Sequence, residues 1–172
     1  MRQVQYTARC VPTPTSGRGA EVTIGWANVQ QIQAATDLVA QHFAELRRHA
    51  AVMSLRPEWE VFAALERRGE LFCLGAWLGE PGTGRLVGYS ATHVRRHLQD
   101  RELIYAQSEA IFVLAEFRAG GVGRKLLEET ESVARKLGAR LLLMHGIRES
   151  AAHRFFERCG MHELEVVLSK EL

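Results

Sequence analysis

Glycines and arginines between residues 111 and 124 have the spacing of a site that binds a phosphate group. Residues 111–114 form an apolar run typical of a strand, residues 120–123 form a glycine turn, and an amphipathic helix follows. Glycines let the backbone approach an anion closely, and the unpaired N–H groups that begin a helix point at it with the positive end of the helix dipole behind them. Arg118 and Arg124 add side-chain charge beside the same turn. The sequence therefore predicts phosphate binding at this turn.

The spacing excludes two common nucleotide motifs. A Walker A loop needs GxxxxGK[ST], whereas Lys125 is followed by Leu126 and no glycine stands at the required place before it. A dinucleotide fingerprint needs GxGxxG, and the third glycine is missing after Gly121 and Gly123. The pattern that fits is RxxGxG, formed by Arg118 and these two glycines.

This strand, RxxGxG loop and helix resemble the pyrophosphate loop of the GNAT superfamily of acyl-CoA-dependent N-acetyltransferases. Residues 152–161, AHRFFERCGM, are similar to a second landmark of that superfamily, AxxFYExxGF. The two landmarks cover residues 109–161, and the N-terminal half matches in the order of its elements. The order of elements in residues 71–145, and the sequence near His97 and Glu109, are also similar to acetyltransferases encoded by phages and prophages. This match is weaker.

The resemblance implies acetyl-CoA as acetyl donor, with no metal, and a site built from named positions. The backbone of Val113 and Leu114 would hold the pantetheine arm beside a splayed strand, and one N–H would face the thioester oxygen. The predicted pyrophosphate cradle consists of Arg118, Ala119, Gly120, Gly121, Val122, Gly123 and Arg124.

Phe156 departs from the family pattern, because the resemblance places a tyrosine there as the acid that protonates the departing thiolate. Phenylalanine cannot donate a proton, so this role is vacant or has moved. A thiol with a pKa of about 8.5 leaves tolerably well as thiolate, so catalysis could continue without the acid. The candidate substitutes are Tyr105, Ser150, Cys159 and His145.

Glu109 is the predicted general base, which would free the lone pair of the attacking amine. It lies at even spacing from Ile111 and Val113 on an expected strand, so we expect it to share their face. Family members often carry a carboxylate near this position. The alternative is a surface or ion-paired glutamate at a strand end, and Glu116 is a poorer candidate because it lies in the loop.

Composition sets wide limits. The 172 residues include 24% charged and 47% hydrophobic residues, close to the averages of soluble globular proteins, and the net charge of +2 does not favour a nucleic-acid partner. No apolar run approaches the roughly 20 residues of a membrane helix, and the N-terminus has no signal-peptide pattern. Three scattered cysteines, and the pair His93 and His97 without a third ligand, do not indicate a zinc site. We therefore expect a cytoplasmic protein that binds no metal, membrane or nucleic acid.

Periodicity and turn residues predict an α/β fold. Residues 1–20 are expected to be a flexible N-terminal segment, and residues 21–172 a single GNAT acetyltransferase domain. The resemblance implies that its fold is a mixed twisted β-sheet with helices on both faces, splayed between the fourth and fifth strands. The expected strands are residues 21–26, 71–78, 85–97, 103–114, 140–145 and 163–168, and the expected helices are residues 29–46, 57–69, 121–137 and 149–158.

The predicted activity is direct transfer of an acetyl group to an amine of a small molecule or peptide in a ternary complex. An acyl-CoA-binding module without transferase activity is the alternative that Phe156 favours, and a nucleotide-binding regulator is a third. The single strand expected after Gly160 leaves an open sheet edge, from which we predict a homodimer. The sequence does not identify the acceptor, because acceptor loops are the variable part of such folds.

Overall fold

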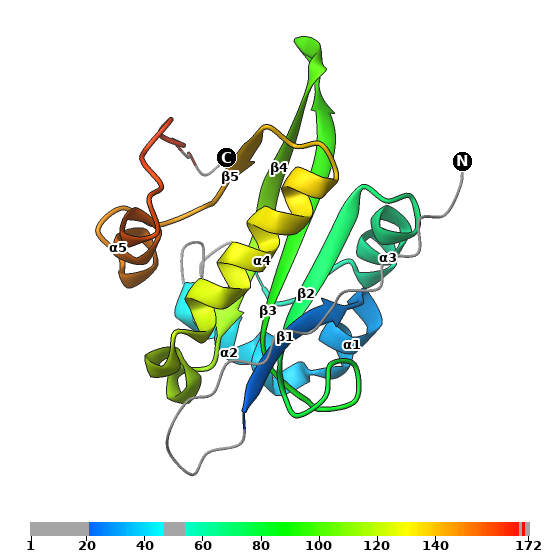
Figure 1. The fold of residues 1–172 in the computed structure, drawn as a ribbon, viewed down its shortest axis with the longest axis vertical. Coiled ribbons are helices and arrows are strands. Elements are labelled where there is room, and N and C mark those ends of the chain that lie inside the picture. Colours follow the sequence, from blue (N-terminus) through cyan, green and yellow to red (C-terminus); the bar gives the residue numbers. More distant parts are fainter. Residues whose placement is uncertain (1–20, 47–53, 169, 171–172) are drawn as a thin grey trace.

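The sheet is the element around which the chain is built (Figure 1). The structure is a computed structural model that describes residues 21–46, 54–168 and 170, so the expectation for residues 1–20 lies outside the described residues. Within this part of the chain, five strands pair in chain order: β1 (Val22–Ala27), β2 (Leu71–Leu78), β3 (Arg85–His97), β4 (Asp100–Val113) and β5 (Leu141–Leu143). The first four pair antiparallel, and β5 pairs parallel to β4.

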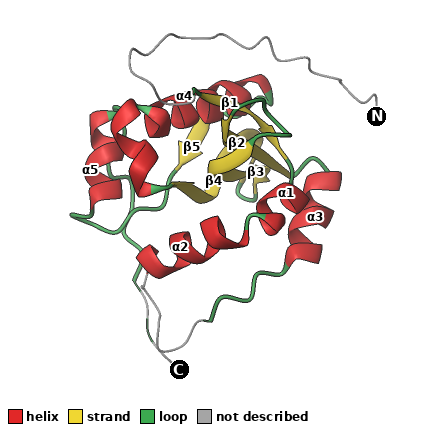
Figure 2. Cartoon of the chain, turned by 90° about the horizontal axis from the view of Figure 1, so that it is seen from below, coloured by secondary structure: helices red, strands yellow, loops and turns green. Residues whose placement is uncertain are grey.

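Helices cover both faces of the sheet (Figure 2). On one face lie α1 (Val29–Ala34), α2 (Thr36–Leu46) and α3 (Trp59–Arg67), and on the other lies α4 (Val122–Lys136). A short 3-10 helix, η1 (Ala115–Gly120), joins β4 to α4, and α5 (Ala151–Arg158) follows β5. The predicted mixed sheet with helices on both faces is confirmed.

The first predicted helix is two helices in the structure. Asn28 begins α1 through a capping box, in which its side chain accepts from Gln31 N–H at 2.8 Å and Gln31 Oε1 accepts from Asn28 N–H at 3.0 Å. Ala35 ends α1 with φ −83° and ψ 57°, which lies outside the helical region. The sequence predicted one helix because the helical spacing of apolar residues continues across this break: Ile32 of α1 and Leu38 of α2 are both buried.

Buried hydroxyl groups fix α4 on the sheet. Thr130 Oγ1 donates to Leu126 O at 2.8 Å and lies 2.9 Å from Ser90 Oγ on β3. Ser90 and Thr130 are fully buried among the apolar residues of α4, so each hydroxyl needs the partner that the other supplies. The middle of α4 is thereby held against β3.

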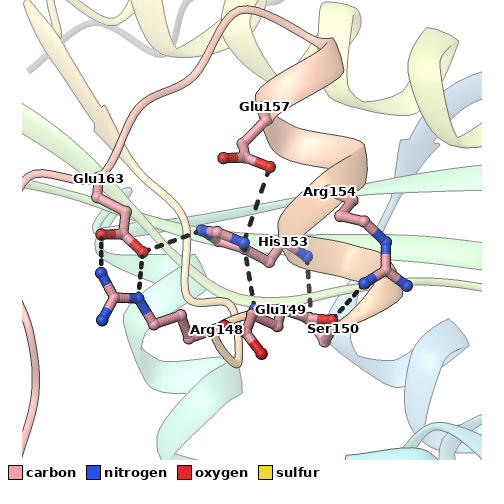
Figure 3. Close-up of polar contacts among 7 residues, drawn as sticks. All are labelled: Arg148, Glu149, Ser150, His153, Arg154, Glu157 and Glu163. Carbon is pink, nitrogen blue, oxygen red and sulfur yellow. Dashed lines mark hydrogen bonds and ion pairs between the residues drawn. The ribbon is translucent and has the colours of Figure 1, made fainter.

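The predicted last strand is wrong. Residues 161–168 are not a strand, and their apolar side chains are exposed, as Leu164 (63%) and Leu168 (89%) show. Glu163 accepts two hydrogen bonds from Arg148, at 3.1 and 3.0 Å, and its carboxylate lies 3.2 Å from His153 Nε2 (Figure 3). These contacts tie the segment to the loop before α5 and to α5 itself. The predicted homodimer was argued from a sheet edge beside this segment, and it stays a prediction.

Candidate functional site

The last part of β4 has an open edge. Strand β5 pairs only with residues 105–107 of β4, in the register Tyr105 to Leu141, Ala106 to Leu142 and Gln107 to Leu143. Beyond Gln107, β4 runs on to Val113 while the chain after β5 turns away towards α5 (Figure 1). The predicted splay between the fourth and fifth strands is therefore present.

Val113 and Leu114 differ in what their backbone groups offer at this edge. Leu114 N–H donates to Val87 O of β3 at 2.9 Å, and Leu114 O accepts from Phe117 N–H at 2.9 Å. Because successive N–H groups of a strand point to opposite sides, Val113 N–H points away from β3, towards the open edge. Of the two predicted positions, Val113 is the one with an N–H group available there.

The glycine turn has the geometry expected of an anion cradle. Gly121 is left-handed, with φ 72° and ψ 10°, a conformation that glycine adopts without strain. The first hydrogen bond of α4 runs from Lys125 N–H to Gly121 O at 3.1 Å, so the N–H groups of residues 122–124 have no acceptor within the helix. A Cβ placed on Gly120 or Gly121 would meet no heavy atom within 4 Å, so the space before the turn is open. The turn therefore fits a pyrophosphate.

Both arginines beside the turn are engaged with other groups. Arg118 donates from Nη2 to both carboxylate oxygens of Glu45, at 2.8 and 2.9 Å, and from Nε to Val113 O at 2.8 Å. Arg124 Nη2 donates to Arg158 O at the end of α5, at 3.2 Å. Glu45 therefore competes with a phosphate for Nη2 of Arg118.

Glu45→Gln is expected to tighten coenzyme A binding, because the variant removes the charge that competes for Arg118. Half-exposed ion pairs contribute about 0.2–1 kcal/mol, so the dissociation constant should fall by no more than about fivefold. Isothermal titration with coenzyme A measures it. Glu131→Gln removes an equal charge from an ion pair with Arg135 farther along α4 and is the matched control. Weaker binding in Glu45→Gln would show that Glu45 positions Arg118 rather than competing for it.

A β-bulge places Glu109 on a different face from the expected one. Ala91 pairs with Ala110 and Thr92 with Ser108, so Glu109 is an extra residue in β4. Ile111 pairs with Ser90, whose hydroxyl contacts α4, whereas Glu109 and Ala110 line a cavity on the face covered by α1–α3. The predicted shared face with Ile111 and Val113 is wrong, because the bulge breaks the alternation between them.

Glu109 lies beside a histidine that sequence reasoning did not connect with it. Its Oε1 is 3.2 Å from His93 Nε2. The His93 side chain is 12% exposed and that of Glu109 is 41% exposed. The carboxylate is therefore open to solvent, and the imidazole beside it is nearly buried. A base at this place can reach both the cavity and bulk water.

The cavity beside Glu109 has a volume of about 140 Å³ and contains a buried polar pair. His42 Nδ1 lies 2.7 Å from the Tyr89 hydroxyl, and the His42 ring stacks on Phe112 with centroids 4.7 Å apart. Burial lowers the pKa of His42 to about 4, which outweighs the opposing effect of Glu45. The imidazole is therefore neutral at pH 7, and burial also raises the pKa of Tyr89.

Acid is expected to destabilise the protein partly through His42. Its pKa is lower in the folded state (about 4) than in the unfolded chain (6.5), so the unfolded state binds the proton first as the pH falls. Its contribution is intact above pH 6.5 and is lost towards pH 4, at about 1.4 kcal/mol per pH unit. Urea unfolding at pH 7 and pH 4.5 should show a smaller loss in His42→Gln than in wild type. Equal losses in the two proteins would contradict this origin.

The two phenylalanines of α5 lie in different surroundings. Phe156 is 6% exposed, and its ring edge would lie 3.6 Å from a Cβ on Gly146. Phe155 instead lies by the glycine turn, where its ring would be 3.6 Å from a Cβ on Gly123.

Of the four candidate acids, His145 is the one beside the opening between β4 and β5. Its Nε2 lies 3.1 Å from Nε2 of Gln107, the last β4 residue paired with β5. Tyr105 lies within the paired region, Ser150 caps α5 by accepting from His153 N–H at 3.0 Å, and Cys159 ends that helix.

The described residues contain neither a metal-ligand cluster nor a membrane-spanning helix. They contain no group of three or more His, Cys, Asp or Glu side chains placed to hold a metal ion. None of the helices described is both long enough and apolar enough to cross a membrane.

The family is decided by a match to the model of the acetyltransferase (GNAT) family over residues 28–161, which contain the turn, the bulge and the cavity strands. The chain belongs to this family. A curated relative, an uncharacterized N-acetyltransferase from Methanocaldococcus jannaschii, is 33% identical over 87 residues. That match covers 49% of this chain and spans only 38% of the length of the relative.

Solved structures support the GNAT fold. The tetramutant of a Bacillus halodurans protein has a TM-score of 0.70 at 18% identity, covering 87% of this chain and 99% of that one. An aminoglycoside acetyltransferase from an uncultured soil metagenomic sample has a TM-score of 0.68 at 16% identity, covering 88% and 96%. Glucosamine-6-phosphate N-acetyltransferase from Arabidopsis thaliana has a TM-score of 0.64 at 15% identity, covering 88% and 98%.

Proposed function

We propose that this GNAT protein transfers an acetyl group from acetyl-CoA to an amine, with Glu109 as general base. The observation that carries the proposal is the position of Glu109 at a bulge of β4, in the stretch that β5 has left. The same strand leads through η1 into the glycine turn at Gly121. Strand β4 thus carries the candidate base Glu109 and an open backbone edge, and it leads into the turn that would hold the phosphates.

Acetyl-CoA would supply the acetyl group as a thioester, held by the turn from Ala119 to Arg124. The turn offers N–H groups and a helix dipole to two phosphates, and Arg118 adds charge once it leaves Glu45. Val113 N–H, at the open edge, is the candidate donor to the thioester oxygen. Preorganised donors of this kind stabilise the charge that develops on the oxygen during acyl transfer.

Glu109 would take a proton from the acceptor, which reaches the protein as an ammonium ion. The freed lone pair attacks the thioester carbon, the new C–N bond forms, and the nitrogen, which becomes positively charged on attack, loses a second proton to water as the C–S bond breaks. The thiolate leaves with the electron pair of that bond and is protonated by solvent, because Phe156 offers no proton. His93, 3.2 Å from the carboxylate, keeps Glu109 directed at the cavity rim.

Ligand-dependent melting tests the donor. We expect acetyl-CoA and coenzyme A to raise the melting temperature at concentrations well above their dissociation constants, and ATP to leave it unchanged, because the glycine spacing suits neither nucleotide motif. Stabilisation by ATP but not by coenzyme A would overturn the proposal in favour of a nucleotide-binding regulator.

An acyl-CoA-binding module without turnover is the second candidate, favoured by Phe156 at the place of the family acid. It predicts the same melting shift with coenzyme A. A spectrophotometric assay of thiol release with a panel of primary amines separates the two, since the module would release none.

A further inference from the structure

The cavity beside Glu109 carries information about the acceptor. It lies between α1–α3 and the sheet, and its volume is about 140 Å³. Its walls are aliphatic and aromatic side chains from α1, α2, α3, β3, β4 and the loop before α3, among them Ile32, Phe43, Leu55, Phe62 and Ala91. A cavity of this lining favours an apolar occupant, because a polar group placed there without a partner loses its hydration.

The polar groups in the wall do not change that preference. The His42 imidazole and the Tyr89 hydroxyl are hydrogen-bonded to each other at 2.7 Å, and His42 is neutral at pH 7 because burial lowers its pKa to about 4. Burial raises the pKa of the Cys73 thiol to about 12, so it is neutral too. Among the described residues that line the cavity, Glu109 is the single charged one, and it is partly exposed.

The volume of the cavity limits the size of the group that it can hold. An engineered apolar cavity of about 150 Å³ in another protein stays dry and binds benzene. The present volume is nearly the same, so it accommodates one aromatic ring or one branched group of four or five carbons. A sugar ring with several hydroxyl groups would lie mostly against apolar walls, where most of those hydroxyl groups would lose their hydration.

We propose that the acceptor is a primary amine joined by a short linker to one compact apolar group of about the size of a phenyl ring. The apolar group occupies the cavity, and the amine nitrogen stands at Glu109 on the rim. This rests on the proposed function, because the same carboxylate serves as base. The acceptor class therefore differs from the sugar amines after which two of the structural relatives are named.

Steady-state kinetics with acetyl-CoA and a series of amines test the proposal. Benzylamine, phenethylamine and isopentylamine are compared with methylamine, ethanolamine and glucosamine by kcat/KM. Each buried CH₂ is worth about fourfold in affinity, so the compact apolar amines should exceed methylamine and ethanolamine by about 10²-fold. Equal or higher kcat/KM for glucosamine or ethanolamine would overturn the proposal while leaving acetyl transfer intact.

Two variants alter the cavity itself. Ala91→Val fills it from β3 and should lower kcat/KM for benzylamine at least tenfold while sparing methylamine. Phe62→Ala enlarges it and should shift the preference towards larger rings such as naphthylmethylamine. Val61→Ala is the control, because Val61 lies on the same helix but is 53% exposed and does not line the cavity. Should Ala91→Val fail to fold, Phe62→Ala decides, and an unchanged preference in it would overturn the proposal.

Two further outcomes are distinguishable. If butyryl-CoA or hexanoyl-CoA reacts faster than acetyl-CoA and Ala91→Val abolishes only that advantage, the cavity holds the acyl chain and the acceptor proposal is wrong. If coenzyme A does not bind and no amine is acetylated, the proposed function itself fails, and the acceptor proposal fails with it.

Discussion

Glu109→Gln is expected to lower kcat about 10²-fold or more while leaving the affinity for acetyl-CoA close to that of wild type. The amide has the same shape but cannot accept the proton that an attacking ammonium must lose, and general base catalysis typically contributes 10²- to 10⁴-fold. The glycine turn follows η1, beyond the end of β4, and is not altered by the substitution, so binding should be retained. Initial rates and isothermal titration measure the two quantities separately.

The defect should shrink at high pH. There the acceptor is already a free amine, and the base has no proton to remove. A pH–rate profile of wild type and Glu109→Gln, converging between pH 8 and pH 10, is the expected result. Glu102→Gln removes an exposed carboxylate from the same strand and is the matched control. A wild-type rate of Glu109→Gln at neutral pH would show that Glu109 is a structural partner of His93.

The parts of the fold that local patterns determine were predicted well. Strands β2 and β3 begin and end at the predicted residues, because both are apolar runs separated by a turn rich in glycine and proline at residues 79–84. The start of α4 was predicted from the glycine turn, and in the structure Gly121 stands directly before α4 in the left-handed conformation. Each of these features depends on neighbours in the sequence.

Features that depend on pairing between distant segments were not predicted. The bulge at Glu109 exists because Ala110 pairs with Ala91 and Ser108 with Thr92, and nothing in the sequence of β4 marks the extra residue. The alternating residues 163–168 have the pattern of a strand, but pairing needs a partner edge, and Glu163 is instead bound to Arg148. A pattern of alternation therefore predicts the capacity to pair and does not identify a partner.

For the candidate site too, sequence reasoning reached contiguous residues and did not reach contacts between distant ones. The proposed cradle consists of adjacent residues, but the cavity proposed to hold the acceptor is assembled from three helices, three strands and the loop before α3. His42 and Tyr89 are 47 positions apart, and their hydrogen bond could be recognised only once α2 was placed on β3. Likewise, the ion pair of Arg118 with Glu45 spans 73 positions, so sequence reasoning did not connect the two residues.

Gly121→Asp is expected to weaken coenzyme A binding at least 10²-fold. The residue is left-handed and begins α4, so a side chain there enters the open space before the turn, where the phosphates are expected. A carboxylate in that space repels the pyrophosphate and itself occupies the positive end of the helix dipole. Isothermal titration with coenzyme A measures the loss, and circular dichroism verifies that the variant is folded.

Gly121→Asn separates charge from shape. Asparagine matches aspartate in size and tolerates the left-handed conformation about as well, so the two variants differ chiefly by one negative charge. If the cradle binds by electrostatics, Gly121→Asn should lose much less affinity than Gly121→Asp. Salt should also reduce the difference between them, because a charge in open solvent is screened at about 10 Å in 0.1 M salt. Equal losses in both variants would mean that close backbone approach, rather than charge, governs binding at this turn, and an unchanged affinity in Gly121→Asp would place the pyrophosphate elsewhere.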